Sequence, residues 1–358
     1  MYCKSTILLL LLFPLAAWAA KGDQEHKIRI VKEFKAGSSS RLSVQNKYGK
    51  IVINIWDKPM VRAEVEVTGF GKNEEQARSM AEMVNIDGSE SGNNIKLETR
   101  YNAAGSGKWF SFNKKDSKDY VNINYVVNVP RNMKGVALEN QFGDILAREL
   151  PFEASINVNY GFFDIGNAEV LRVTMNYTDK ARISQAEKLD LNANYSSLRC
   201  GATKELKVNS NNSSYNFGDA GSMRLNSNYD EYRLAGVSDV SLSGNYSSLR
   251  AELLKKNAVI NVNYTDVSFR QIAPSFTSIT AVLRYSDVRL GVGRSTPFRL
   301  IANIRHGDIN TGSFEWKNIS NVRKNSSLSF SAITSNATDA SGVIKIDGSY
   351  CDVKLTGE

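Results

Sequence analysis

Histidine and cysteine are scarce in this chain of 358 residues, which contains two histidines and three cysteines. The sequence also lacks a glycine-rich phosphate loop, a paired-cysteine metal motif and a nucleophile elbow. Because catalysis needs several activatable groups that converge on one site, these absences argue against an enzyme. We therefore expect no catalytic residues, no metal site and no cofactor. His26 lies near the start of the mature chain, and His306 fits a repeated aromatic position, where we interpret it as structural.

Long apolar runs are also missing, except for one at the start of the chain. Lys4 precedes the apolar run Ile7–Ala19, which ends in small residues. This order is typical of a secretory signal peptide, and the run is too short to span a bilayer comfortably. We expect residues 1–19 to be a signal peptide, with a single membrane anchor as the alternative. After cleavage no transmembrane segment is expected, and the protein is exported to the periplasm, secreted or held at the cell surface.

Export leaves Cys200 and Cys351 in the mature chain, too few for a disulfide framework. A chain of this length can bury a sufficient core without such bonds. The net charge is +8, and the 37 acidic residues are interspersed with the basic ones. Ordinary solubility explains this balance, although a basic excess also favours anionic surfaces such as phosphate or acidic glycans. We expect no nucleic-acid partner.

Residues 20–130 form a mixed region in which several segments alternate apolar and polar residues, the pattern of strands. The range 73–84 is predicted to be a helix, because Asn73 can cap it and one face is apolar. That face consists of Ala77, Met80, Ala81 and Val84. Residues 102–119 are predicted to form a polar loop. We expect this region to cap one end of the repeats that follow it.

Residues 131–358 repeat a unit of about 17–21 residues. The hexapeptide Asn-Tyr-Ser-Ser-Leu-Arg occurs at 194–199 and again at 245–250, an interval of three 17-residue units. Each clear unit places an aromatic residue after an asparagine or another polar residue, and one unit has a serine at 213 or 214 instead. The conspicuous positions are Asn159, Tyr160, Asn176, Tyr177, Asn194, Tyr195, Asn228, Tyr229, Asn245, Tyr246, Asn263, Tyr264 and Tyr285.

Apolar residues alternate on both sides of the aromatic position, with one odd step just after it. Alternation predicts strands with one buried face, and the odd step predicts a corner, so each unit should contain two short strands and two turns. The 44 residues between His306 and Tyr350 would hold two degenerate units.

Two all-β architectures fit these units: a β-solenoid (β-helix), and a long antiparallel β-meander. Stacked rungs place equivalent residues about 4.8 Å apart and reward identical side chains, whereas a meander places them about twice as far apart. The repeat therefore favours the solenoid. Asparagines and aromatics would form structural ladders, with the rings facing inward or lying at the corner. Cys200 and Cys351 would lie several rungs apart, beyond disulfide reach.

Two segments resemble the DUF4097-type adhesin family of exported bacterial proteins, namely Asn46–Asp57 and Val127–Leu150. Both contain an aromatic residue followed by glycine, a polar residue and isoleucine, at 48–51 and 142–145. In later units serine or threonine replaces the glycine, which keeps the turn chemistry. The resemblance implies a short helix-bearing β region that leads into a β-helix, and it implies binding at the cell surface or envelope. It carries over no catalytic residues.

Charged residues recur at the outward positions of the units. Acidic residues often stand two positions after the aromatic one, and basic residues often stand four positions after it. The basic set consists of Arg199, Arg233, Arg250 and Arg289, with Lys354 as a further member. Aligned arginines could bind acidic sugars or lipid phosphates, although a solvated face with internally paired charges is the simpler interpretation. Calcium suits the acidic positions poorly, because arginines lie beside them.

The sequence thus predicts an exported, non-enzymatic β-solenoid that acts as an adhesin or envelope-binding module. Its partner is unknown, and a glycan or protein of the envelope or extracellular space is the expected class. One alternative is a polysaccharide-active β-helix enzyme, which requires two carboxylates at catalytic separation. The other is a periplasmic structural or signalling accessory without a ligand.

Overall fold

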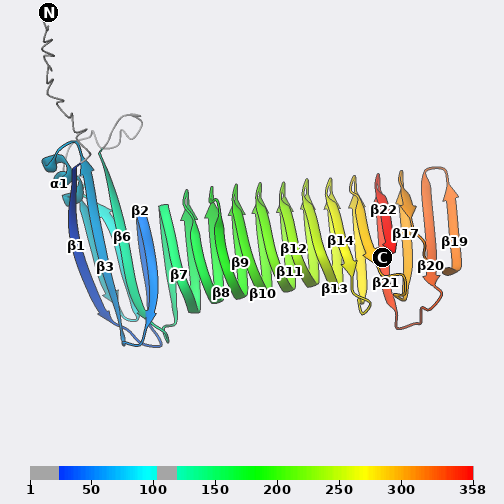
Figure 1. Cartoon of the computed structure of the whole chain (residues 1–358), viewed down its shortest axis with the longest axis horizontal. Helices are drawn as coiled ribbons and strands as arrows, with labels where there is room; N and C mark the ends of the chain where they lie inside the picture. The colour runs from blue at the N-terminus through cyan, green and yellow to red at the C-terminus, as the bar shows by residue number, and fades with distance from the viewer. Residues whose placement is uncertain (1–23, 103–118, 358) are drawn as a thin grey trace, which may run out of the picture.

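The computed structural model describes residues 24–102 and 119–357, which form a β-solenoid preceded by a smaller β region with one helix. In Figure 1 the molecule is a long rod, with the helix-bearing region at one end and the rungs side by side along its length. Consecutive repeat strands pair in parallel, which confirms the solenoid and excludes the meander for the repeat. The expected signal peptide and nearly all of the expected loop at 102–119 lie outside the described residues.

The N-terminal region contains β1 (Gln24–Lys35), β2 (Arg41–Trp56), β3 (Met60–Gly71), α1 (Glu74–Glu82), β4 (Val84–Ser91), β5 (Asn94–Tyr101) and β6 (Tyr120–Pro130). The regular rungs contain β7 (Gly135–Asn159), β8 (Phe163–Asn176), β9 (Ala181–Asn194), β10 (Ser197–Asn211), β11 (Ser214–Asn228), β12 (Glu231–Asn245) and β13 (Ser248–Asn263). The remaining strands are β14 (Asp266–Ile272), β15 (Ser278–Arg284), β16 (Val288–Val292), β17 (Phe298–Arg305), β18 (Asp308–Asn310), β19 (Trp316–Lys324), β20 (Ser327–Thr334), β21 (Gly342–Ser349) and β22 (Asp352–Gly357).

The first rung is β2, which pairs in parallel with β7 on one side and with β5 and β6 on the other. Antiparallel strands β1, β3 and β6 continue the sheet beyond it, and α1 packs on β1 and β3. Gly69 permits this close approach, since a Cβ there would lie 2.1 Å from the carbonyl oxygen of Ala77. The Asn73 side chain accepts a hydrogen bond from the Gln76 N–H at 2.8 Å and caps the helix. The predicted helix is too long at its end, because Val84 already belongs to β4.

Each regular rung turns at three corners rather than at the two predicted from the sequence. In β10 the buried side chains fall at Leu198 and Cys200, then Thr203, then Leu206, Val208 and Ser210. Steps of two mark straight segments, and the steps of three on either side of Thr203 mark two corners. The third corner follows Ser210. A face that contributes one inward residue has no period of its own, so the sequence pattern did not reveal it.

The core of the solenoid is a set of columns of apolar residues, one per rung. Leu189, Leu206, Met223 and Val240 stack in one column, and each is at most 3% exposed. Burying a side chain of this size contributes about 1.5–3 kcal/mol. Stability therefore accumulates rung by rung through contacts between nearest neighbours. Within the described residues, no helix is long and apolar enough to cross a membrane.

The strands at the end of the chain are inserted between earlier rungs. β21 pairs with β15 on one side and with β17 on the other, and β22 lies in the same way between β16 and β18. Figure 1 shows these red strands between the yellow and orange ones. β17 then pairs antiparallel with β20, and β20 with β19. The prediction of two degenerate rungs between His306 and Tyr350 is wrong, because this segment contains the β19–β20 hairpin.

The inserted rung makes a specific mutational prediction. Ile346 of β21 is fully buried between Ala281 and Ala302, so Ile346→Asp should lower the free energy of unfolding by about 3 kcal/mol or more. Hydrogen exchange should accelerate in β15, β17 and β20, while β8 to β11 stay protected, because solenoid rungs depend on their neighbours. Lys345→Ala, on the exposed face of the same strand, is the control. Uniform loss of protection along the rod would contradict the prediction.

Candidate functional site

Aromatic side chains line one corner of the solenoid. The tyrosines at this corner have φ between 49° and 56°, a left-handed conformation that bulky residues rarely adopt. Each of them, from Tyr160 to Tyr350, is 48–57% exposed. The rings therefore lie at the corner and point outward, and the expectation that they might face inward is wrong. A positive φ reverses the chain direction sharply, and it turns this side chain away from the core.

The rings stack on one another along the rod and form what we call the aromatic stack. Neighbouring centroids are 4.6–5.5 Å apart, and ring planes differ by at most 16°. Each such contact contributes about 0.5–1.5 kcal/mol, which offsets a left-handed backbone cost of about 1–2 kcal/mol. The stack runs through Tyr48, Phe142, Tyr160, Tyr177 and Tyr195 and, after an interruption, through Tyr229, Tyr246, Tyr264, Tyr285, Tyr350 and His306.

An asparagine ladder accompanies the aromatic stack at the preceding position. The side-chain amide of each asparagine donates to the side-chain oxygen of its neighbour at 2.8–3.0 Å. These bonds join Asn159, Asn176 and Asn194, and they join Asn228, Asn245 and Asn263. Among the described residues no such bond involves Asn211, which lies between the two groups. The ladder is therefore interrupted in the same rung as the aromatic stack.

A ladder of hydroxyl groups lies on the inner side of the same corner. The Ser196 hydroxyl donates to the carbonyl oxygen of Asn194 in its own rung at 2.8 Å, and it accepts from the Thr178 N–H at 3.1 Å. Ser247 makes the equivalent bonds in its rung. These contacts satisfy buried backbone groups that the corner removes from the sheet ladder. They explain the first serine of the repeated hexapeptide.

Asp230 takes the place of this hydroxyl in one rung and is 3% exposed. Its carboxylate accepts hydrogen bonds from the Ser213 N–H at 2.8 Å and from three hydroxyl groups, those of Ser210, Ser227 and Tyr232. Burial raises the pKa of Asp230, and these hydrogen bonds oppose the rise only in part. The repeat pattern does not predict an interior role for Asp230; its only sign in the sequence is an aspartate where most units have serine or threonine.

Asn212 occupies the aromatic position of the interrupted rung, with φ 53°. The sequence analysis assigned this position to serine 213 or 214, and the structure corrects it by one or two residues. Asparagine tolerates the left-handed region, so the backbone turns there without a bulky side chain. The rings of Tyr195 and Tyr229 consequently flank a position without a ring.

The same rung also differs at one outward position, where it carries Asn216, whereas Ser214 matches Ser197 of the preceding rung. The flanking rungs place Arg199 and Arg233 level with Asn216. We call Asn212, Ser214 and Asn216 the notch. A hollow of about 690 Å³ lies over Asn212 and Ser214, and a second of about 640 Å³ lies over Asn216. The first hollow also extends over Thr178 and Ser248, and the second over Asp164, so the notch lies within a broad, shallow depression of the solenoid surface.

The four arginines predicted from the sequence stand in one column of the sheet, together with two further cations. Successive strand pairs align Arg182, Arg199, Arg233, Arg250, Arg289 and Lys354, interrupted by Asn216 and Ser268. We call these six residues the basic column. Arg182 escaped the spacing analysis because Lys180, an additional left-handed residue, shifts it by one position from Tyr177.

Members of the basic column differ in how their charge is balanced. Glu231 lies 2.6 Å from Arg233 and 3.4 Å from Arg250, so these two arginines share one carboxylate. Arg182 and Arg199 lie side by side on adjacent rungs, and neither makes an ion pair within the described residues. Both border the hollow over Asn216. Arg289 and Lys354, on adjacent rungs toward the other end of the column, make no ion pair within the described residues either, so the column is unneutralised at both ends and paired in its middle.

The acidic positions form a column of their own near the end of the rod. Asp266, Asp287, Asp352 and Asp308 lie on successive rungs, and each carboxylate accepts the backbone N–H of the next aspartate at 2.9–3.2 Å. These bonds explain the acidic residues as support for the corner. In the described part of the chain, no group of three or more acidic, histidine or cysteine side chains is arranged to hold a metal ion.

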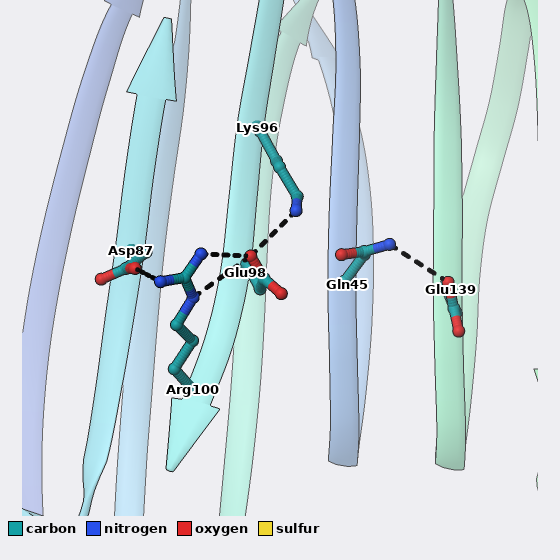
Figure 2. A network of polar contacts seen from close by, with 6 residues as sticks. All are labelled: Gln45, Asp87, Lys96, Glu98, Arg100 and Glu139. Carbon is teal, nitrogen blue, oxygen red and sulfur yellow. Dashed lines mark hydrogen bonds and ion pairs between the residues drawn. The ribbon is translucent and has the colours of Figure 1, made fainter. Parts of the chain in front are cut away.

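Part of the charge of the N-terminal region lies in an internally paired network, which Figure 2 shows. Glu98 of β5 accepts hydrogen bonds from Lys96 at 2.9 Å and from Arg100 at 3.1 Å, and these bonds lower its pKa. Arg100 also reaches Asp87 of β4 at 3.0 Å. Such exposed pairs contribute little to stability. Because the charges neutralise each other, this surface is a weaker candidate for binding an anion than Arg182 and Arg199.

The cysteines and histidines of the described residues lie in the core, in the aromatic stack or on a strand. Cys200 and Cys351 are buried as free thiols, and burial raises their pKa values to about 12 and about 11. Thiols of this kind are poor nucleophiles at neutral pH. His306 ends the aromatic stack, 4.6 Å from the ring of Tyr350. His26 lies on β1 opposite Gly69.

Comparison with known proteins finds distant structural similarity alone. No family model and no curated protein matches the chain. It is similar to a candidate cell adhesion protein from Clostridium sporogenes, at 9% identity and a TM-score of 0.20 over 93% of this chain and 100% of that one. It is also similar to a candidate adhesin from Parabacteroides merdae, at 11% identity and a TM-score of 0.31 over 91% and 95%. A candidate lipid-binding protein from Parabacteroides distasonis matches at 10% identity and a TM-score of 0.28 over 91% and 96%. The function therefore has to be inferred from this chain's own residues.

Asp230 makes the stability depend on pH in a defined direction. Because its pKa is raised in the folded state, the folded chain binds its proton more tightly than the unfolded chain, and stability falls as pH rises above about 4. Tyr215 and Tyr232, which adjoin it, have raised pKa values and stay neutral in this range. Asp230→Asn should therefore be more stable than the wild type at pH 7, with the difference shrinking toward pH 4. Chemical denaturation of both proteins across this range is the measurement, and a difference independent of pH would contradict the prediction.

Proposed function

We propose that this protein is an exported, non-enzymatic β-solenoid of the DUF4097 adhesin type that binds an anionic glycan of the envelope or cell surroundings. The observation that carries this proposal is the basic column. Its cations occur at one register position over many rungs, although the residues are far apart in sequence. An extended polyanion can contact several such residues at once, which multiplies weak individual contacts.

The spacing of the column suits repeated anionic groups. Neighbouring rungs lie about 4.8 Å apart, so Arg182 and Arg199 present two guanidinium groups within reach of one carboxylate or phosphate. Guanidinium binds such groups through paired hydrogen bonds and is more weakly hydrated than ammonium. Because neither arginine has a carboxylate partner in the described structure, binding requires no ion pair of the protein to break.

A polysaccharide-cleaving enzyme has weaker support. The acidic column offers carboxylates on neighbouring rungs, but Asp287 and Asp352 each use an oxygen to hold the N–H of the next rung. Glycosidases need one carboxyl as acid and one as nucleophile or base on either side of a bound sugar bond. The acidic column runs along a convex corner and supports its backbone, so we assign the surface to binding.

The proposal predicts binding that depends on charge and on one face of the rod. The wild type should bind polygalacturonate more tightly than dextran, a neutral polysaccharide. Arg182→Glu with Arg199→Glu should weaken binding at least about ten-fold, because two attractive contacts become repulsive. Salt at about 1 M, where the Debye length is about 3 Å, should have a similar effect. Biolayer interferometry with immobilised polysaccharide measures both.

A matched control reverses two other cations on adjacent rungs. Lys207 and Arg224 are exposed and pair in register on a different face of the solenoid. Lys207→Glu with Arg224→Glu makes the same change of net charge and should leave binding largely intact. Equal losses in the two double variants would show a non-specific effect of net charge, and they would overturn the assignment to the basic column.

A further inference from the structure

We propose that the notch is a binding site for one six-membered sugar ring, held between the side chains of Tyr195 and Tyr229. This inference rests on the proposed function and names the part of the ligand that gives specificity. Two of its residues, Asn212 and Asn216, differ from their equivalents in the flanking rungs, whereas the basic column consists of residues that follow the repeat.

The aromatic stack itself defines the size of the vacant position. Tyr177 and Tyr195 stack at 5.2 Å, and Tyr229 and Tyr246 stack at 4.9 Å, in each case one rung apart. Tyr195 and Tyr229 are two rungs apart, which separates their rings by about 9.6 Å. Asn212 is too short to reach the level of those rings. A six-membered ring placed between them would therefore lie at the distance at which tyrosines stack elsewhere in the column.

The inner rim of the notch is polar, which favours a sugar over an aromatic guest. Asn212, Ser214 and Asn216 offer amide and hydroxyl groups that both donate and accept hydrogen bonds. Within the described structure none of these three side chains is engaged in a hydrogen bond. By contrast, the hydroxyl of Ser197, which is the equivalent of Ser214 in the preceding rung, donates to Asp179 at 2.6 Å. Sugar rings need this combination, with C–H faces against aromatic rings and hydroxyls against polar groups. An aromatic side chain would leave the rim unsatisfied.

The rigid frame beneath the notch keeps the two tyrosines apart. Asp230 fixes the corner from inside through the Ser213 N–H, and the buried rings of Tyr215 and Tyr232 stack at 4.9 Å in the same two rungs. Collapse of Tyr195 onto Tyr229 would require the rungs themselves to approach, which the parallel ladder from β10 to β12 prevents. Tyr195 and Tyr229 are 53% and 57% exposed, close to the values of tyrosines that have rings on both sides. The parallel ladder, which fixes the spacing of the rungs, therefore keeps the position between the two rings vacant before a ligand arrives.

The notch also connects the sugar position with the basic column. Asn212, Ser214 and Asn216 lie along one rung, and Arg199 and Arg233 stand on either side of Asn216. Because Asn212 lies at the corner and only Ser214 and Asn216 belong to β11, the notch is shorter than the distance of about 13 Å that four extended residues span. A ligand lying across the rod can thus place one ring between the tyrosines and an acidic group near Arg199. This arrangement selects an acidic hexopyranose glycan as the ligand class.

The decisive experiment places a tyrosine in the notch, the residue that the flanking rungs carry at this position. Asn212→Tyr should complete the aromatic stack, so its melting temperature should equal or exceed that of the wild type. Its affinity for oligogalacturonate should fall at least about ten-fold, since the ring position is then occupied. Asn212→Gly, which also accepts a positive φ, keeps the ring position open and removes only one amide of the rim, so it should lose much less affinity than Asn212→Tyr. Isothermal titration calorimetry with the free-acid and methyl-esterified oligosaccharides measures both variants.

The two oligosaccharides separate failure of this inference from failure of the proposed function. If Asn212→Tyr weakens both forms, and Arg182→Glu with Arg199→Glu weakens only the free acid, both proposals are supported. If Asn212→Tyr binds like the wild type, the notch is not the sugar site, while charge-dependent binding still supports the basic column. If Asn212→Tyr abolishes binding that charge reversal leaves unchanged, the notch is supported and the anionic proposal falls. Failure of the wild type to retain any hexopyranose on a glycan array, or preference for a tyrosine-containing peptide, would overturn the notch.

Discussion

The parallel backbone ladder between rungs determines almost everything else in this molecule. It places each residue about 4.8 Å from its equivalent in the next unit, so a favourable contact between two identical side chains is repeated along the rod. Asparagine amides then bond to asparagine amides, hydroxyls close the inner corner, and rings stack on rings. No single contact is strong. Because all of these contacts share one spacing, their contributions to stability sum along the rod. A side chain that departs from the repeat interrupts the contacts on both of its sides.

The tyrosines illustrate how this spacing permits an unusual local choice. A left-handed corner is normally occupied by glycine or asparagine, as at Asn212. Tyrosine is tolerated there because each ring contacts the rings above and below it, and those contacts offset the backbone cost. The result is a row of half-exposed aromatic surface on an otherwise polar exterior. Soluble proteins seldom leave so much aromatic surface uncovered without a partner.

The sequence predicts the solenoid well because its period is visible in residues such as Asn194-Tyr195 and Asn245-Tyr246. It also predicts that Arg199, Arg233, Arg250 and Arg289 occupy equivalent positions. The prediction fails where residues that occupy equivalent places in the structure are not separated by the regular repeat length in the sequence. Lys180 shifts the register and hides Arg182, and the single inward residue of the short face hides a corner.

Other features depend on contacts between distant parts of the chain. The local sequence does not predict that β21 pairs with β15 and β17. Its alternation of apolar residues would fit equally well beside another strand of the solenoid. The interior role of Asp230 depends on Ser210 and Ser227, which lie on separate rungs. The notch is a different case. Its residues were visible as a missing aromatic, but their meaning required the tyrosines on both sides to be placed in space.

The insertion of β21 and β22 between earlier rungs has a consequence for how the chain matures. During synthesis, residues 278–292 emerge with an open sheet edge, and residues 298–310 cannot dock on it in their final place. Both segments reach their final pairing only when residues 342–357 form β21 and β22 between them. A chain interrupted before that point would keep an unpaired parallel edge, a surface prone to association with other chains. The distal end of the rod is therefore completed only when residues 342–357 have been synthesised and have paired between the earlier strands.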